Sequence, residues 1–432
     1  MLRRIWLCAA LLLSVSVAHA ELQIEINQGV ENPTPIAVVP FAWQGVGAPP
    51  EDAAQIVDSD LARSGQFYPV SRRDMLSYPS RESELFFRDW RAISAEYVLI
   101  GRVSVGSQAR IDFQLFDTTR QQAVQEGTVI GPVPELRMLA HQVSDSVYES
   151  LTGIPGAFAT RLLYVSVTRN PEGKDFYRLT LADADGRRPI VLLEGRDPIM
   201  SPAWSPDGKE VAYVSFETGR PSIILQDVNG PYREQLTSFR GINGSPVFSP
   251  DGKELAMVLS RDGDPEIFVM NLATRKLRRI TRHRAIDTEP SWSPDGEKLI
   301  FTSDRGGRPQ IYQVELATNF IERLTFVGDY NARARLLPDG KHLVFVHRRN
   351  GVFHIAWQDL QRDNVLVLTQ TDLDESPSLS PNGSMLIYAT QYQGRGILGV
   401  VSIDGRVKYR LPSSVGDVRE PAWSPFMSNV VN

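Results

Sequence analysis

The sequence is almost free of cysteine, and it has no long hydrophobic run after its first residues. The one cysteine, Cys8, lies in a segment where the basic pair Arg3-Arg4 precedes the apolar run 5–17 and the pattern Ala18-His19-Ala20. This order is typical of a bacterial secretory signal peptide, which we assign to residues 1–20. The mature chain would begin at Glu21 without cysteine, which excludes disulfides and thiolate metal ligands. No later segment has the roughly 18 apolar residues of a transmembrane helix, so we expect an exported protein in the periplasm.

Positive charge is scarce relative to negative charge. The chain has 46 Lys and Arg residues against 51 Asp and Glu residues, a net charge of −5. The balance becomes more negative when Arg3 and Arg4 leave with the signal peptide. Domains that bind nucleic acids favour a basic surface, so we expect no nucleic-acid partner.

Familiar catalytic and cofactor motifs are missing as well. The sequence has no Gly-x-Ser-x-Gly elbow, and Gly-Lys pairs such as Gly208-Lys209 lack the spacing of a phosphate-binding loop. Asp183-Ala-Asp-Gly186 is weakly similar to a calcium loop, but the downstream glutamate is wrongly spaced, and a hairpin turn is the favoured interpretation. Zinc-motif spacing is absent from four histidines, His283, His342, His347 and His354. We therefore expect a protein that is not an enzyme and has neither cofactor nor metal.

What the sequence does contain is a short phrase that returns at a nearly fixed interval. Pro202-Ala-Trp-Ser-Pro-Asp-Gly208 recurs at 246–252 and 290–296, and weaker copies occupy 334–340, 377–383 and 421–425. The aromatic or leucine position of this phrase falls every 43 or 44 residues, at Trp204, Phe248, Trp292, Leu336, Leu379 and Trp423. A period of about 40–50 residues is typical of the blades of a β-propeller.

Each repeat is predicted to form four short strands, the first over Pro-x-aromatic-Ser and the others after a Pro-Asp-Gly turn. Residues 161–193 supply only the second to fourth strands of a unit, and residues 421–425 supply only a first strand. We infer that the C-terminal strand pairs beside Leu162–Val167, which closes a ring of six blades without a free edge. A linear solenoid is the alternative, but its end units would be capped units and not half-units.

The residues before the repeats predict a different kind of fold. Residues 52–64 and 134–151 have helical spacing, and strand-like runs occupy 36–41, 67–70, 97–105, 111–116 and 123–129. They predict a small α/β domain over residues 34–156, which ends at the Gly/Pro cluster 153–156. The expected fold class is thus a two-domain chain. An N-terminal α/β domain is followed by an all-β six-bladed propeller over residues 157–432, closed by its C-terminal strand.

Residues 21–33 form an extended segment ahead of the α/β domain. Glu21-Leu-Gln-Ile-Glu-Ile-Asn27 alternates strictly between polar and apolar residues. One interpretation is an edge strand of the α/β domain, and the other is a detachable strand that adds to the sheet of a partner. The two are compatible if the segment switches between them.

At this point the residues resemble those of a known family, the TolB proteins of the Tol–Pal system of Gram-negative bacteria. The resemblance rests on the signal peptide, the mature start 21–26, the run Pro35-Ile-Ala-Val-Val-Pro-Phe41, the α/β domain and the six repeats. It covers essentially the whole chain. The repeat alone is less specific, because propellers of peptidases and lyases share it. The fourth repeat departs from the pattern, with Ala334 in place of proline and Leu336 in place of the aromatic residue.

The resemblance implies a periplasmic protein–protein interaction hub. It implies that the channel face of the propeller binds the lipoprotein Pal and that colicins can use the same face. Other envelope proteins are expected as further partners. It also implies a role in outer-membrane integrity and in constriction during cell division, for a chain that is monomeric on its own. TolA would contact the N-terminal segment, whose candidate residues are Glu21, Leu22, Gln23, Ile24, Glu25 and Ile26.

The candidate site for Pal is the channel mouth. Loops that enter each first strand share one face of a propeller with the turns between second and third strands, so residues just before each Pro-x-aromatic should point toward the channel. We expect an acidic inner mouth and a basic outer rim; ordinary solvated loop charges are the alternative. The candidates are Ser201, Asn243, Ser245, Asp287, Thr288, Glu289, Asp329, Arg333, Glu375, Ser376 and Glu420. The rim is expected from Arg220, Arg261, Arg305, Arg308, Arg348, Arg349 and Arg395.

Three other interpretations concern the same region. The repeated Trp204, Trp292 and Trp423 could form a ligand cage, but packing between blades is favoured because they recur at a structural position. Asp372-Leu-Asp374-Glu375 could hold a cation at the channel mouth. A periplasmic propeller enzyme, such as a polysaccharide lyase, is the alternative function. It would need several histidines in the channel, where the loops offer His283 alone, and a metal-content assay would distinguish it.

Overall fold

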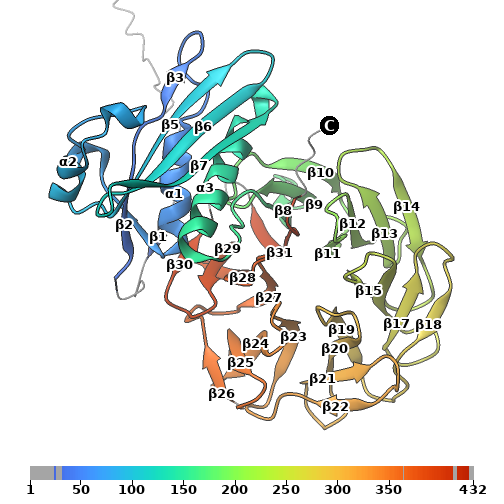
Figure 1. Cartoon of the computed structure of the whole chain (residues 1–432). Helices are drawn as coiled ribbons and strands as arrows, with labels where there is room; N and C mark the ends of the chain where they lie inside the picture. Colours follow the sequence, from blue (N-terminus) through green and yellow to red (C-terminus); the bar gives the residue numbers. More distant parts are fainter. Residues whose placement is uncertain (1–23, 26–31, 363, 412–415, 428–432) are drawn as a thin grey trace, which may run out of the picture.

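The computed structural model describes residues 24–25, 32–362, 364–411 and 416–427. Figure 1 shows two parts, an α/β domain and a ring of six β-sheets around a central channel. The expected fold class is confirmed, and the second part follows the first in the chain. Within the described residues, no helix is both long enough and apolar enough to cross a membrane.

The α/β domain is built on one mixed sheet. The strand order is β4-β2-β5-β6-β7, with β3 paired to β5. Strand β2 runs parallel to β4 and to β5, and β3 runs parallel to β5. The pairs β5–β6 and β6–β7 are antiparallel. The bounds are β2 Thr34–Val38, β3 Ala42–Gln44, β4 Phe67–Pro69, β5 Tyr97–Val105, β6 Ala109–Asp117 and β7 Gln122–Gly131. The helices are α1 Ala53–Ser64, α2 Phe87–Ala92 and α3 Leu136–Thr152, with short 3-10 turns at Arg72–Asp74, Glu82–Glu84 and Val133–Glu135.

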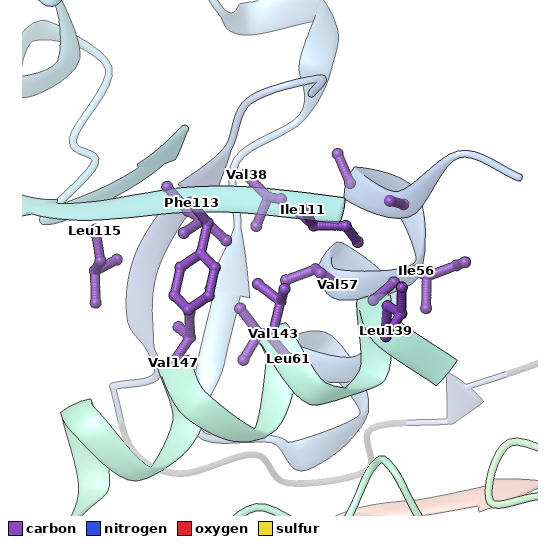
Figure 2. Packing of buried hydrophobic residues seen from close by; sticks show 14 of the residues in the cluster. Val38, Ile56, Val57, Leu61, Ile111, Phe113, Leu115, Leu139, Val143 and Val147 are labelled. Atoms are coloured by element: carbon purple, nitrogen blue, oxygen red, sulfur yellow. The ribbon is translucent and has the colours of Figure 1, made fainter. Parts of the chain in front are cut away.

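Helices α1 and α3 cover one face of this sheet. The helical spacing over 134–151 gives α3 an apolar face, which packs against side chains of α1 and of β6, as Figure 2 shows for Val57, Phe113 and Val143. Asp52 caps the first turn of α1, because its side chain accepts a hydrogen bond from the backbone N–H of Gln55 at 2.9 Å. The other face packs against α2 through Trp90 and Phe116. The sequence pattern did not predict α2.

The propeller consists of six four-stranded antiparallel units. Their strands, in chain order, are β8 Arg161–Arg169, β9 Asp175–Asp183 and β10 Ile190–Gly195; β11 Ile199–Trp204, β12 Glu210–Ser215, β13 Ser222–Asp227 and β14 Arg233–Thr237; β15 Asn243–Phe248, β16 Glu254–Leu259, β17 Glu266–Asn271 and β18 Leu277–Arg279; β19 Asp287–Trp292, β20 Lys298–Ser303, β21 Gln310–Glu315 and β22 Ile321–Arg323; β23 Asn331–Leu336, β24 His342–Arg349, β25 Val352–Asp359 and β26 Asn364–Val367; β27 Glu375–Leu379, β28 Met385–Tyr392, β29 Arg395–Ser402 and β30 Lys408–Arg410; and β31 Asp417–Trp423. The four strands predicted for each repeat are confirmed.

The ring is closed by the C-terminal strand, as the sequence predicted. Strand β31 pairs antiparallel with β8, so that Trp423 lies opposite Leu162 and Ala422 lies opposite Leu163. The first blade is therefore β10-β9-β8-β31, made from the start and the end of the propeller sequence. Closure gives both sides of β8 a partner and leaves β31 as the innermost strand of the blade, beside the channel.

The Ser-Pro-Asp-Gly phrase forms the same turn in successive blades. In the second complete repeat, Ser249 Oγ donates to Asp251 Oδ1 at 2.6 Å, and the backbone N–H of Lys253 donates to the same carboxylate oxygen at 3.1 Å. Gly252 has φ of 71°, a conformation that glycine adopts without steric cost. The turn thus sets the register of β15 against β16 by local hydrogen bonds.

This turn gives a stability prediction. Asp251→Ala should lower the free energy of unfolding of the propeller by about 1–2 kcal/mol, because a hydroxyl and a backbone N–H lose their acceptor. Lys253→Ala is the control for the exposed ion pair that the Lys253 ammonium makes with Asp251 Oδ2 at 3.3 Å, because this variant keeps the backbone N–H that the turn uses. Urea unfolding followed by circular dichroism measures both variants. Equal losses in the two variants would show that the aspartate does not hold the turn.

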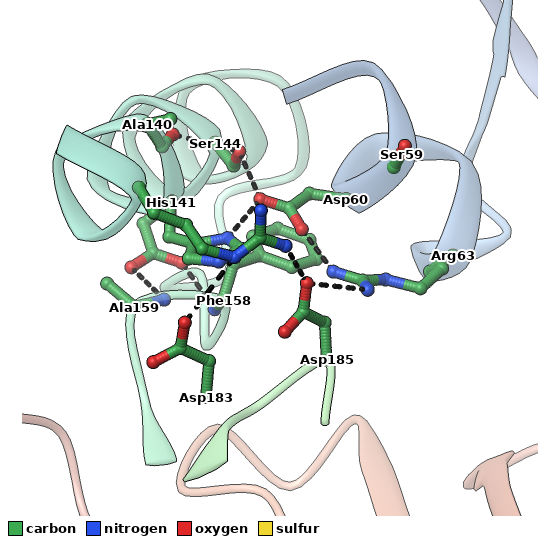
Figure 3. A network of polar contacts seen from close by, with 12 residues as sticks. Ser59, Asp60, Arg63, Ala140, His141, Ser144, Phe158, Ala159, Asp183 and Asp185 are labelled. Carbon is green, nitrogen blue, oxygen red and sulfur yellow. Dashed lines mark hydrogen bonds and ion pairs between the residues drawn. The ribbon is translucent and has the colours of Figure 1, made fainter. Parts of the chain in front are cut away.

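The two domains meet through a buried ionic network, shown in Figure 3. Asp60 of α1 accepts a hydrogen bond from Ser144 Oγ at 2.6 Å, lies 2.7 Å from His141 Nδ1, and pairs with Arg63. Asp185, in the turn between β9 and β10, pairs with Arg63 and with Arg137 of α3. The predicted hairpin turn at 183–186 is confirmed, but the sequence did not reveal that this turn fastens the propeller to the α/β domain.

Candidate functional site

The six residues that precede the repeated phrase form a ring inside the channel. Each has a left-handed backbone conformation, with φ between 46° and 55°. They also stand where the pairing of the first strand with the second shifts register in every blade. We call them the channel ring: Ser201, Ser245, Glu289, Arg333, Ser376 and Glu420. All six are among the predicted site residues.

The register shift explains why these side chains reach the channel. A β-bulge adds a residue to one strand and turns the local side chains away from their usual alternation. The proline that follows in five of the six blades cannot donate to the next strand, so the pairing is interrupted at the same place. Left-handed non-glycine residues cost of order 1 kcal/mol each and concentrate at binding and catalytic sites. The channel that they line has a volume of about 470 Å³.

The charges of the channel ring are paired between blades. Arg333 Nε donates to Glu289 Oε1 at 2.7 Å, and Arg333 Nη1 lies 3.5 Å from Glu420 Oε2. Arg333 also donates to the hydroxyl of Ser376. Burial disfavours the guanidinium charge, but Glu420 and Glu289 outweigh burial and raise the pKa of Arg333. The inner mouth is therefore not simply acidic, because one arginine bridges blades and neutralises part of the acidic half of the ring.

Two predicted site residues are buried inside the blade edges and do not reach the channel surface. Asn243 is 1% exposed, accepts a hydrogen bond from the backbone N–H of Phe239 at 3.0 Å and donates to its carbonyl at 2.7 Å. Asp287 is 0% exposed and accepts from Arg305 Nη2 at 2.6 Å. The sequence pattern placed both at the mouth because they begin a first strand. The structure corrects this, since their side chains hold the preceding loops and turns.

The remaining predicted residues lie nearer the surface of this face. Asp329 pairs with Arg348 Nη2 at 2.7 Å and with Arg308 Nη1 at 2.9 Å. Thr288 is half-buried next to Glu289, and Glu375 is exposed next to Ser376. Much of the predicted basic rim is therefore paired with acids of its own loops, and it is less positive than the sequence suggested.

An apolar collar around the channel mouth was not predicted. Its members are large hydrophobic residues that are between 40% and 61% exposed and stand in or next to the loops that enter the first strands: Met200, Ile242, Ile286, Phe326, Val327 and Leu373. Large hydrophobic residues that are exposed in successive loops of one face make that face a candidate protein-binding surface. The signal was present in the sequence, because each of these residues stands one to five positions ahead of, or just inside, a first strand.

In the described part of the chain, the contacts that we find between the α/β domain and the propeller lie away from this face. The α/β domain contacts the opposite face, where the turns between first and second strands lie: Asn382 Nδ2 donates to the carbonyl oxygen of Pro155 at 2.8 Å. The turn that carries Asp185 also belongs to that opposite face. The channel ring and the apolar collar can therefore receive a partner without displacing the α/β domain.

The repeated tryptophans join neighbouring blades. Trp204 Nε1 donates to the carbonyl oxygen of Ala422, and Trp292 Nε1 donates to that of Val247, both at 3.1 Å. Trp423 Nε1 donates to Thr160 Oγ1 at 2.8 Å. Their indole N–H groups are thus engaged by the protein, in agreement with the prediction of packing between blades.

The acidic residues of the candidate cation sites already interact with other side chains of the protein. Among the described residues, His141, Asp183 and Asp185 place ligand atoms within 4.8 Å of one another. Arg137 forms ion pairs with the carboxylates of Asp183 and Asp185, so a cationic side chain already compensates their charge. Asp374, from the second candidate, is buried and accepts from Thr371 Oγ1 at 2.7 Å, which uses its carboxylate in the loop.

The N-terminal segment pairs with the propeller. Ile24–Glu25 form strand β1, in which Ile24 lies opposite Tyr409 and Glu25 opposite Lys408 of β30. The interpretation as an edge strand of the α/β domain is therefore wrong for these residues: the free edge that they complete belongs to the blade β27–β30. The other residues predicted to contact TolA, Glu21, Leu22, Gln23 and Ile26, lie outside the described residues, as does the predicted signal peptide.

Known proteins are similar to this chain over nearly its whole length. The TolB beta propeller domain family matches residues 148–427, and the TolB amino-terminal domain family matches residues 22–124. The Tol-Pal system protein TolB of Pseudomonas syringae pv. tomato is 58% identical over 96% of both chains. That of a Marinomonas species is 62% identical over 96% of both. The crystal structure of TolB from Acinetobacter baumannii superposes with a TM-score of 0.85 at 44% identity, over 94% of this chain and 100% of the other.

Proposed function

Since the chain belongs to the TolB family of Tol-Pal system proteins, we propose that it is a protein–protein interaction hub of that system in the periplasm. The channel face binds the lipoprotein Pal, and the N-terminal segment binds TolA. These contacts support outer-membrane integrity and constriction during cell division, and colicins can compete for the same face. The protein acts by binding and not by catalysis.

One observation carries the proposal for Pal: the channel face combines an exposed apolar collar with a polar channel. Interfaces that form between separately folded proteins have an apolar, often aromatic centre and polar groups that fix orientation. Phe326 and Ile286 supply apolar area at the mouth, and Glu289 and Glu420 supply acceptors below it. The described residues that line the channel include no histidine, so the alternative of a lyase has no support in the geometry.

The test uses two phenylalanines of the same blade. Phe326 is 61% exposed in the apolar collar, and Phe320 is 62% exposed in the turn between β21 and β22 on the opposite face. Phe326→Asp should weaken binding of the periplasmic domain of Pal by roughly tenfold or more, because aromatic residues near the centre of an interface contribute strongly. Phe320→Asp should leave the affinity unchanged. Isothermal titration calorimetry measures both.

The same titrations with TolA complete the test. Deletion of residues 21–26 should abolish TolA binding, and Phe326→Asp should not affect it, because the two surfaces are separate. A Pal affinity that drops equally in both phenylalanine variants would place Pal elsewhere. TolA binding that survives the deletion would contradict the role of the N-terminal segment.

A further inference from the structure

A partly open cavity lies at the seam between the two domains. Its volume is about 190 Å³, and it is lined by the end of α3, the linker after α3, the turns β27–β28 and β29–β30, and strand β31. Tyr148, Tyr409 and Trp423 are buried members of this lining. A dry protein cavity of about 150 Å³ is large enough to bind benzene, so this cavity has room for a single aromatic ring with a small substituent.

The walls of the cavity are mostly aromatic and aliphatic. Tyr148 and Phe158 meet edge to face with ring centroids 5.6 Å apart, and Trp423 lies in the same lining with Ile154 and Met385. Aromatic rings favour edge-to-face and offset contacts with a further ring. The shape and chemistry of the lining therefore suit a planar aromatic molecule more than a branched aliphatic or a sugar.

Most polar groups of the lining already have partners in the protein. Ser380 Oγ donates to Asn382 Oδ1 at 2.7 Å, and Ser402 Oγ engages Asp404 in its own turn. Arg63 is held by Asp60 and Asp185. The cavity therefore offers no unpaired charge, which disfavours a carboxylate, a phosphate or an ammonium ion as ligand.

The hydroxyl of Tyr409 is the exception. It makes no hydrogen bond to any residue within the described part of the chain, although the side chain is buried. Burial raises the pKa of Tyr409 to about 12, so the group is a neutral phenol that can donate and accept. Buried tyrosine hydroxyls usually have a partner, and an unpartnered one beside a cavity points to a ligand.

We propose that this seam cavity binds a small, neutral aromatic molecule with one hydrogen-bonding group, of the size of phenol to indole. The ring packs among Tyr148, Phe158 and Trp423, and the polar atom pairs with Tyr409 Oη. Both domains contribute walls, so the bound molecule stabilises the docked arrangement of the domains by mass action. The binding of Pal or TolA plays no part in this site.

The experiment compares two probes on the full mature chain by fluorine NMR: 4-fluorophenol and fluorobenzene. Wild-type protein should bind both, with 4-fluorophenol roughly tenfold tighter or more, as expected for one extra buried hydrogen bond. Tyr409→Phe should remove this preference and leave fluorobenzene unchanged, and the fold should tolerate it because the hydroxyl has no protein partner. Met385→Trp should fill the cavity and abolish binding of both probes.

Three results would overturn the proposal. The first is no binding of either probe to the wild-type protein up to the solubility limit. The second is a preference for 4-fluorophenol that persists in Tyr409→Phe, a variant that decides the matter even if Met385→Trp does not fold. The third is binding that appears only after residues 21–31 are deleted, which would assign the cavity to the chain's own N-terminal segment.

Discussion

A chain that ends after Leu411 is expected to lose the cooperative unfolding transition of its propeller. The truncation removes β31, which is the first strand of the first blade and the only partner of β8 on the channel side. It also withdraws Trp423 from the core between the last and first blades, and Ala422 from the core on the other side of β31. Loss of a single buried tryptophan side chain costs about 3–5 kcal/mol. The whole strand therefore represents a large share of a domain stability of about 5–15 kcal/mol.

The matched control is a chain that ends after Met427, which keeps all of β31. It should unfold at the same midpoint as the full chain. Differential scanning calorimetry gives the transitions, and size-exclusion chromatography reports association through the exposed edge of β8, which we expect only for the longer truncation. If both truncated chains unfold alike and remain monomeric, the ring does not depend on its C-terminal strand.

Asp60→Asn should destabilise the α/β domain by about 3–5 kcal/mol, the usual cost of removing one partner from a buried ion pair. Asp60 is fully buried, and its carboxylate interacts with the side chains of Arg63, His141 and Ser144. The amide that replaces the carboxylate keeps the shape of the side chain but leaves the Arg63 charge with less compensation. Urea unfolding followed by fluorescence measures the loss, and domain-resolved transitions are needed because the chain has two domains.

Asp58 of the same helix provides the matched control with the opposite sign. Burial raises the pKa of Asp58 to about 6, since the charged form is poorly solvated there. At pH 8 its ionised carboxylate opposes folding, so Asp58→Asn should leave the stability unchanged or raise it. Two equal losses would mean that the helix itself, and not the ion network, is sensitive to substitution.

The network also sets a pH dependence. Burial opposes the charge of His141, but the Asp60 carboxylate beside it outweighs burial and raises the pKa of His141. This contribution to stability is complete below the unfolded value near 6.5 and is lost as the pH rises through the folded pKa. Burial alone would raise the pKa of Asp185, but Arg63, His141 and Arg137 lower it to about 2. That contribution is present above about pH 4 and is lost as the pH falls toward 2.

A melting-temperature profile from acid to alkaline pH checks these signs. The wild-type melting temperature should be highest between the acidic range where the Asp185 contribution is lost and the alkaline range where the His141 contribution is lost. Asp60→Asn should flatten the alkaline side of the profile, because His141 then lacks the neighbour that raises its pKa. If the melting temperature of Asp60→Asn falls with rising pH as steeply as that of the wild type, protonation of His141 does not contribute to the stability of the domain.

The sequence predicted the parts of this molecule that depend on local pattern. The repeat at Trp204, Phe248 and Trp292 was enough to predict the blades, because each copy of the phrase contains the residues that form its turn. Half-units at the two ends sufficed for closure. Channel-ring residues such as Ser201 and Glu420 could be chosen because the bulge stands at a fixed distance from the phrase.

The sequence could not predict pairings that depend on distance between blades or domains. Arg333 pairs with Glu289 and Glu420 of two other blades, and no local pattern shows which side chains of the ring meet. Alternation showed that the N-terminal segment would be a strand but not that its neighbour would be β30. The burial of Asp287 depends on Arg305 from the next turn of the same blade, which sequence spacing alone does not orient.

The pairing of β31 with β8 has a consequence for how the molecule is made. Synthesis proceeds from the N-terminus, so β8 to β10 exist long before their fourth strand, and the contact that joins them spans more than half of the chain. Contacts of such long range form slowly and late. An interrupted translation product therefore holds an unfinished first blade with an open edge, a form that chaperones and proteases can recognise. In this architecture the strand that completes the first blade is synthesised after the strands of all the other blades.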